Sequence, residues 1–474
     1  MAAESRVISR GTEGTDTQAD GPAIGSTARL SLTPGYARVG EAVRVRGEGF
    51  APGVIAQLIW HTVDARYELE RGTEYLGQGF SERSWTLRDV RADRDGAIDA
   101  TFEVPRDFGG SHDVRARVGD QEVAQAGLIV TPTISLSPSE GPIGTEIEVT
   151  IVGVEWRPNT SVWHMLYDNK YLGFLSAVTQ RGVATAHIRA AGPLGRHVIA
   201  LWRNAYNSTP YLARDASPFR DMPGPGTELM FTVTSDDGPP DQRIEDFSTT
   251  DHPWPSLTTG PGSLSVFPDR GRLGDAIALH AIHLPPSTEV AVRWWTTVGD
   301  RITNVGMVEE ARMRRVLTTD ARGQFAFDMT IPDDLGGQHK IDVIHGDQVL
   351  ASTGVVIVPA LVEAAPRRLR VGEKIDIHLK GLGWTTYDNT YTVTYDNAYI
   401  GYVCGFSTGG DVRFTVTATG VPGTHIVDLY PTIYKEKDPS VMPRGMFSVP
   451  QLTYRDDHPQ RRTPAVRLAF EIVE

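Results

Sequence analysis

Cysteine is nearly absent from this chain of 474 residues, in which Cys404 is the only one. A single cysteine excludes a disulfide within the chain and a zinc site built from several thiolates. Positive charge is also scarce, because 46 Lys and Arg residues face 59 Asp and Glu residues, for a formal net charge of −13. Nucleic acids and anionic membrane surfaces require a basic footprint, so we expect neither as the main partner.

Long apolar runs are missing as well. No stretch of 18 apolar residues occurs, so the sequence predicts no transmembrane helix and no direct insertion into a membrane. Residues 1–27 are polar and rich in Gly, Ala, Thr and Asp, without the apolar centre of a secretory leader. We expect these residues to form a disordered tail.

Helical periodicity is the third absence, since we find no convincing helical run of ten or more residues. Apolar and polar residues alternate instead, as in 42–46 (AVRVR), 146–151 (EIEVTI) and 374–380 (KIDIHLK). A period of two is typical of a strand with one face in a core and the other in water. Turn-forming pairs separate these runs at short intervals, which predicts an all-β chain of antiparallel sandwiches.

The most informative feature that is present is an internal duplication. The segment 141–206 aligns without a gap on the segment that ends at Tyr434, at a constant offset of 228 positions. The aligned landmarks are Trp156 and Trp384, Tyr167-Asp168-Asn169 and Tyr395-Asp396-Asn397, His197 and His425, and Tyr206 and Tyr434. The preceding stretches also match, with 105–112 (PRDFGGSH) repeated at 332–339 (PDDLGGQH). The repeating unit is therefore a pair of modules, in the order A-B-A-B.

The repeats set the expected domain boundaries. We predict module A1 at 28–132, B1 at 133–235, A2 at 262–359 and B2 at 360–474, with a flexible linker at 236–261 that is rich in Asp, Pro, Thr and Gly. Proline at each A–B junction predicts two fairly rigid pairs on a hinge. Both B modules carry a long Pro-rich connection, 207–227 and 435–465, before the last strand, and loops of that length are often functional.

The module openings resemble bacterial cell-surface Ig-like modules, including the IPT/TIG group. The residues that carry this resemblance are 138–144 (PSEGPIG) with Gly153, 39–52 with Val39-Gly40 and GEGFAP, and the late turns 93–105 and 320–332. The resemblance implies four tandem Ig-like β-sandwich domains and a cell-surface style of protein, and it implies nothing about ligands. No signal peptide or transmembrane segment is seen, so the sequence leaves the compartment undetermined.

The most specific local motif is Tyr-Asp-Asn-x-Tyr-x-Gly, at 167–173 and 395–401. One interpretation is a hairpin, because Asp and Asn tolerate the left-handed geometry of a tight turn. The other is a binding loop, in which an acid and an amide hold sugar hydroxyls against an aromatic ring. The candidate ligand-binding residues, with the tyrosines near the long loops included, are Tyr167, Asp168, Asn169, Tyr206, Tyr395, Asp396, Asn397 and Tyr434.

Three further patterns favour structural roles. His112, His197, His339 and His425 each follow a glycine turn, so we expect each ring to cap a loop carbonyl. The Asp93–Gly96 segment lacks the ligands of a full calcium loop and indicates a turn, although a weak calcium site stays open. Trp60, Trp163 and Trp294 occupy comparable strand positions and Cys404 follows strand residues, so we expect all four in cores.

No catalytic motif, metal-ligand pattern or cofactor fingerprint is found, so we expect no catalytic residue, no metal and no cofactor. The sequence therefore favours a non-enzymatic structural or adhesive protein whose two B modules bind a protein or glycan, or self-assemble. The first alternative is a carbohydrate-binding protein with equivalent sites in both B modules. The second is a hydrolase, or an accessory subunit of an enzyme, with a site between modules.

Overall fold

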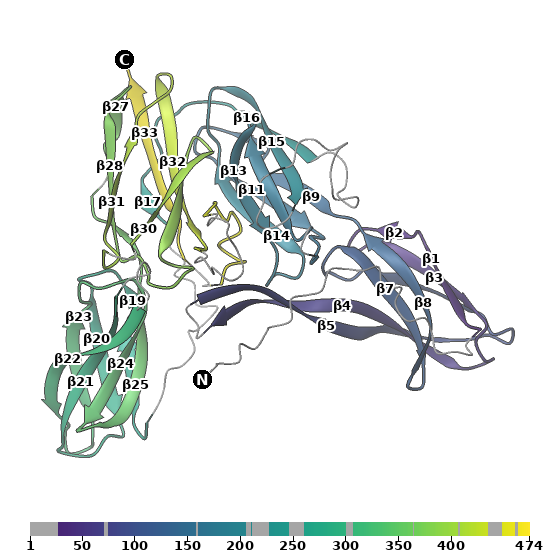
Figure 1. The fold of residues 1–474 in the computed structure, drawn as a ribbon, viewed down its shortest axis with the longest axis horizontal. Coiled ribbons are helices and arrows are strands. Elements are labelled where there is room, and N and C mark those ends of the chain that lie inside the picture. The colour runs from purple at the N-terminus through teal and green to yellow at the C-terminus, as the bar shows by residue number, and fades with distance from the viewer. Residues whose placement is uncertain are drawn as a thin grey trace, which may run out of the picture. The chain divides into compact units, whose positions relative to one another are not determined.

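The computed structural model describes residues 27–70, 74–157, 160–204, 210, 227–245, 260–299, 307–363, 365–405, 408–434, 448–459 and 463–474. Every regular element in these ranges is a β-strand, and Figure 1 draws them as arrows without a helical ribbon. The all-β fold class predicted from the alternating pattern, tandem Ig-like sandwiches, is confirmed. The expected N-terminal tail, 1–27, lies outside the described residues apart from Thr27.

No helix in the described ranges is long and apolar enough to span a membrane.

The chain divides into two compact units. The first consists of Met1–Asp64 and Phe80–Thr133, and the second consists of Ala65–Gly79 and Ile134–Glu474. The division therefore passes through one hairpin, whose distal part belongs to the second unit. In sequence, A1 has an insertion around 63–79 relative to A2, and the distal part of the hairpin lies within it.

The first unit contains the sheets of A1, of orders β1-β3-β6 and β2-β8-β7-β4-β5. Its core draws on both sheets, with Val43 and Val45 of β3 facing Trp60 of β4. The alternating burial along β3 matches the pattern in the sequence. The strands are β1 (Arg29–Thr33), β2 (Tyr36–Ala37), β3 (Ala42–Glu48), β4 (Ile55–Glu70), β5 (Glu74–Arg91), β6 (Ile98–Glu103), β7 (Gly110–Val118) and β8 (Gln121–Val130).

Within the second unit, B1 repeats this plan with sheets β14-β11-β9 and β10-β16-β15-β12-β13. The large sheet ends at the edge strand β13. The strands are β9 (Thr133–Ser137), β10 (Glu140–Gly141), β11 (Glu146–Val152), β12 (Val162–Tyr167), β13 (Lys170–Ser176), β14 (Val183–Arg189), β15 (Gly195–Asn204) and β16 (Thr227–Val233).

A2 has sheets β18-β20-β23 and β19-β25-β24-β21-β22, and its core centres on Trp294. Its edge strand β22 is exposed along most of its length. The strands are β18 (Ser263–Phe267), β19 (Arg270–Gly271), β20 (Ala276–Ile282), β21 (Glu289–Gly299), β22 (Met307–Thr318), β23 (Phe325–Thr330), β24 (Gly337–His345) and β25 (Gln348–Ile357).

B2 has sheets β26-β28-β31 and β17-β33-β32-β29-β30, and β27 also pairs with β33. Here β30 is the edge strand that corresponds to β13. The strands are β17 (Arg243–Ile244), β26 (Ala360–Leu361), β27 (Arg368–Arg370), β28 (Lys374–Lys380), β29 (Thr390–Tyr395), β30 (Ala398–Cys404), β31 (Val412–Thr417), β32 (Gly423–Thr432) and β33 (Val466–Val473).

The expected flexible linker, 236–261, is ordered in its first ten residues. Arg243 and Ile244 form β17 and pair with β33 of B2. Asp236 accepts hydrogen bonds from the backbone and hydroxyl of Thr424, and Glu245 is buried beside Arg467. Charged groups of the segment thus find partners on B2, which composition alone does not reveal. Residues 246–259 lie outside the described ranges.

B1 and B2 share one hydrophobic core, which contradicts the expectation of two rigid pairs that move about a hinge. The core cluster of B1 contains Ile426 and Tyr430 from β32, and Leu452 and Tyr454 from the long connection of B2. These four side chains are buried. The duplicated modules B1 and B2 therefore belong to the same compact unit.

Candidate binding surface at the B-module hairpins

The two Tyr-Asp-Asn motifs form tight hairpins. Asp168 and Asn169 join β12 to β13, with φ angles of 49° and 62°. Asp396 and Asn397 join β29 to β30, with φ angles of 44° and 59°. Two consecutive left-handed residues define the turn that matches the twist of a hairpin, and Asp and Asn adopt it readily. The hairpin interpretation of the motif is confirmed.

Each hairpin aspartate holds a histidine of the neighbouring strand. Asp168 lies 2.5 Å from Nδ1 of His197 and accepts the backbone N–H of Val198 at 3.0 Å. Asp396 repeats this arrangement with His425, at 2.6 Å, and with the backbone of Ile426. Burial disfavours the charged ring of His425, but the hydrogen bond and the charge of Asp396 outweigh it and raise the pKa of His425.

All four histidines cap a loop carbonyl, as predicted. In each case Nε2 faces the carbonyl oxygen of the residue four positions earlier, at 2.7 to 2.8 Å. These carbonyls belong to Phe108, Pro193, Leu335 and Val421. The rings therefore fix the loop before the strand in every module.

The aromatic partner of the histidine differs between the module types. Trp60 stacks on His112 with ring centroids 4.3 Å apart, and Tyr167 stacks on His197 at 5.3 Å. Strand register gives the same correspondence, because Trp60 pairs with Val114 and Tyr167 with Ile199, each two residues after its histidine.

The expected equivalence of Trp163 with Trp60 and Trp294 is therefore wrong, although all three are buried as predicted. Tyr167 and Tyr395 take that place in the B modules, four residues later on the strand than Trp163. A search for matching tryptophans misses them because tyrosine has replaced tryptophan.

The tyrosine hydroxyls of the motif bond within the protein. Tyr167 is buried and donates to the carbonyl of Ala191 at 2.9 Å. Tyr395 is half-buried and donates to the carbonyl of Thr419 at 2.5 Å. Tyr434 is half-buried, with its backbone N–H donated to Thr386, and Tyr206 lies outside the described residues.

The two asparagines have different surroundings. Asn169 is exposed, whereas Asn397 is buried and donates through Nδ2 to the carbonyl of Arg189 in B1, at 2.7 Å. The B2 hairpin thus takes part in the contact with B1. The two copies of the motif do not present the same groups to solvent.

The edge of B1 is covered by its own chain. Phe174 of β13 donates its N–H to Pro450 and accepts the N–H of Leu452, at 2.9 and 2.8 Å. This segment of B2 forms a parallel bridge with β13, between Phe174 and Gln451. It places Leu452 and Tyr454 in the core of B1. The long connection of B2, which the sequence marks as a functional candidate, is used here for an internal interface.

The corresponding side of B2 is a groove of about 490 Å³ between the edge strands β30 and β31. Its walls carry Ile400 and Val416, and one end carries Tyr395, Asp396 and, from the B1 hairpin, Lys170. Of the eight predicted site residues, the structure brings Tyr395 and Asp396 into this groove. Thr415 and Thr417 add hydroxyl groups.

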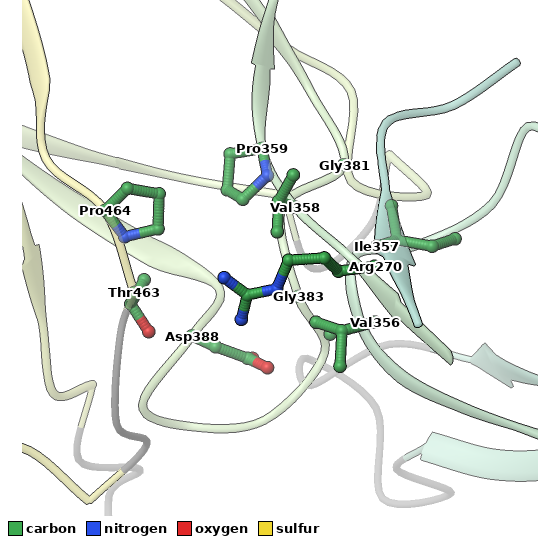
Figure 2. Close-up of a pocket in the computed structure, with 11 residues that line it drawn as sticks. Arg270, Val356, Ile357, Val358, Pro359, Gly381, Gly383, Asp388, Thr463 and Pro464 are labelled. Carbon is green, nitrogen blue, oxygen red and sulfur yellow. The ribbon is translucent and has the colours of Figure 1, made fainter. Parts of the chain in front are cut away.

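A second pocket lies between A2 and B2 and is shown in Figure 2. The guanidinium group of Arg270 extends into it, towards the side chains of Thr463 and Asp388. Its volume of about 20 Å³ has room for about one water molecule. This pocket is therefore too small for the inter-module substrate site of the hydrolase alternative.

Other candidate positions are structural. Asp93 accepts the backbone N–H groups of Asp95 and Ala97, and Asp320 does the same for Arg322 and Gln324, so both segments are turns. Cys404 is half-buried rather than in the core as expected, because β30 is an edge strand. Within the described ranges, no group of three or more His, Cys, Asp or Glu side chains could hold a metal ion.

Comparison with known proteins finds similar solved structures but no matching protein family. No model of a protein family matches the sequence, and no curated protein matches it. Similar solved structures include Salmonella alpha-2-macroglobulin reacted with methylamine, at 10% identity and a TM-score of 0.18, covering 92% of this chain and 30% of that one. An ICAM-5 D1–D4 ectodomain fragment is 12% identical with a TM-score of 0.17, covering 90% of this chain and 100% of its own.

A putative membrane anchored protein from Corynebacterium diphtheriae is also similar, at 12% identity and a TM-score of 0.17, covering 94% of this chain and 91% of its own. The chain spans 30% of the length of the Salmonella protein.

Proposed function

We propose that this chain is a non-enzymatic structural protein of four Ig-like modules that binds a macromolecular partner through the open side of B2. The observation that carries the proposal is the contrast between the two B modules. The edge strand of B1 is covered by chain, whereas its counterpart in B2 borders a groove with an apolar wall and a charged end. An apolar groove rimmed by polar residues is typical of a binding surface.

The proposal replaces two equivalent sites by one. Tyr167 is buried, and the edge of its module is occupied by 450–452, so the surface of B1 is not a copy of the surface of B2. The structure of this compact unit therefore does not present two equivalent binding sites. Binding at a single surface follows.

The test is adhesion by the full chain immobilised on beads, offered glycans, cell surfaces and a second sample of itself. We expect one of these to bind and the variant Ile400→Lys to lose that binding, because the new charge points into the groove. Binding that persists in Ile400→Lys, or no binding to any of them, would contradict the proposal. Val316→Lys, on the exposed strand β22, is the matched control.

A glycan is a second candidate partner, which Tyr395, Asp396 and the threonine hydroxyls of the groove favour. Lys170 is suited to test for glycan binding, since it is exposed and lines the groove without any role in a core. Lys170→Ala should weaken a glycan hit on an array while the melting temperature stays unchanged. A hit that is insensitive to this change would place the sugar elsewhere.

A further inference from the structure

We propose that the open edge of β30 accepts a short segment from a second copy of this chain, in the way that β13 accepts residues 450–452. This inference rests on the proposed function and names its partner. The duplicated sequence supplies an internal template, because it contains one filled and one open version of the same edge.

The two edges correspond residue by residue at the offset of 228 positions. Phe174 of β13 corresponds to Tyr402 of β30, and Gly173 corresponds to Gly401. Phe174 lies beneath the covering segment and is 3% exposed, whereas Tyr402 is 44% exposed. We attribute this difference to the covering segment. A Cβ atom at Gly173 would collide with the carbonyl of Pro450, whereas one at Gly401 would meet no atom within 4 Å.

The hydrogen-bonding groups of β30 are set out for a further strand. Among the described residues β30 pairs only with β29, so its outer edge forms no ladder there. In B1 the same edge both donates to and accepts from the segment at Phe174. An unpaired edge beside an apolar groove is a template for strand addition.

The groove also matches the side chains of such a segment. In B1, Leu452 and Tyr454 enter the hydrophobic core, and Gln451 and Thr453 are buried beside them. In B2 the groove between Ile400 and Val416 occupies the same side of the sandwich. The ligand is therefore a short segment that bridges the edge as residues 450–452 do and places an apolar side chain in the groove, as Leu452 does in the core of B1.

The sequence of B1 contains a counterpart of the covering segment. Residues 450–456 read PQLTYRD, and residues 210–215, in the matching connection of B1, read PYLARD. The likeness continues, with PQRRTP at 459–464 and PFRDMP at 218–223. The sequence thus has two such stretches, and within the described residues one of them, 450–452, lies on the edge strand β13.

A second copy is the occupant because the contact is heterologous. The internal pair joins a segment of B2 to the edge of B1, so repeating it requires a segment of B1 on the edge of a B2. Contacts of this head-to-tail kind join one copy to the next, in a closed ring when the rotation between copies closes and in an open filament when it does not. The chain would then polymerise through the B modules, with a free segment at one end and a free edge at the other.

The test combines sedimentation velocity of the full chain with binding of a synthetic peptide of residues 207–218. We expect the mass of the full chain to rise with concentration, and the peptide to bind and to inhibit assembly. Ile400→Lys should remain monomeric and weaken peptide binding by about tenfold or more, since a charge on an edge blocks strand addition. Leu212→Asp should also stay monomeric but still bind the wild-type peptide.

Val316→Lys is the matched control, because Val316 on edge strand β22 and Ile400 are both 53% exposed. It should assemble like the wild type, and thermal melting should show that all variants fold. If the chain is monomeric but binds the peptide, the B1 segment fills the β30 edge of its own chain. That result would contradict a second copy as the occupant. Assembly that survives Ile400→Lys would overturn the acceptor. The full chain could also adhere to glycans or cells without self-assembly and lose that adhesion in Ile400→Lys. This result would support the proposed function and reject this inference.

Discussion

The guanidinium group of Arg189 donates a hydrogen bond of 2.5 Å to the carboxylate of Asp428, and the two side chains are 4% and 1% exposed. Arg189 ends β14 of B1 and Asp428 lies in β32 of B2. The same carboxylate lies 3.1 Å from Arg467, which is buried as well. Two cations thus share one anion in the shared core, so the pairing of B1 with B2 depends on a charge that water cannot reach.

Removing that carboxylate should be costly. Asp428→Ala leaves Arg189 and Arg467 buried with less compensation, and we expect a loss of about 3–5 kcal/mol in the free energy of unfolding of the second unit. Chemical denaturation followed by circular dichroism measures it. The control is Glu471→Ala, which breaks an exposed pair with Arg368 and should cost at most about 1 kcal/mol. Equal costs would show that burial does not govern these pairs.

The covering segment, residues 450–452, should contribute as much to the free energy of unfolding as an ordinary core strand does. Leu452→Ala removes a fully buried side chain from the core of B1 and should cost about 2–5 kcal/mol. Hydrogen exchange should also accelerate at the amide of Phe174, which donates to Pro450. The control is Ile400→Ala, at an exposed side chain, which should cost about 0.5 kcal/mol or less. If Phe174 stays protected in Leu452→Ala, the segment docks without that side chain.

The buried indole of A1 depends on an aspartate. Trp60 donates through Nε1 to Asp107 at 2.9 Å, and Trp294 repeats the bond with Asp334 in A2. Asp107→Ala leaves the indole N–H unsatisfied in the core, for an expected loss of about 1–3 kcal/mol. Tryptophan fluorescence during denaturation reports it. Asp95→Ala, in an exposed turn of the same module, should leave the midpoint nearly unchanged.

The stability of the second unit should depend on the protonation of His425. The pKa of this ring is raised in the folded protein, so the folded state holds the proton more tightly than the unfolded state does. The resulting stabilisation is complete below the unfolded pKa of about 6.5 and is lost as pH rises through the folded pKa. The variant His425→Gln should therefore lose more stability at pH 6 than at pH 9. A loss that is the same at both values would show that the ring contributes only as a neutral cap.

Local pattern predicted much of the fold and little of the binding surface. Strand alternation such as that of 42–46 predicted which side chains face a core, because the period of two depends only on neighbouring residues. The positive φ angles at Asp168 and Asn169, and the carbonyl caps at the four histidines, follow equally from local chemistry. The groove of B2 was missed because its residues come from β30, β31 and a hairpin more than 200 positions away in sequence.

The sequence by itself determined the repeat, the strands and the turns of this protein, since each is encoded over a few residues and then copied. It could not determine that the two copies of a motif have different structural surroundings. Only tertiary structure decided that residues 450–452 cover β13, that Asn397 is buried against B1 and that β30 borders an open groove. The physical reason is that burial and edge pairing depend on which distant segment occupies a surface, and equivalent strands of a repeat can receive different neighbours.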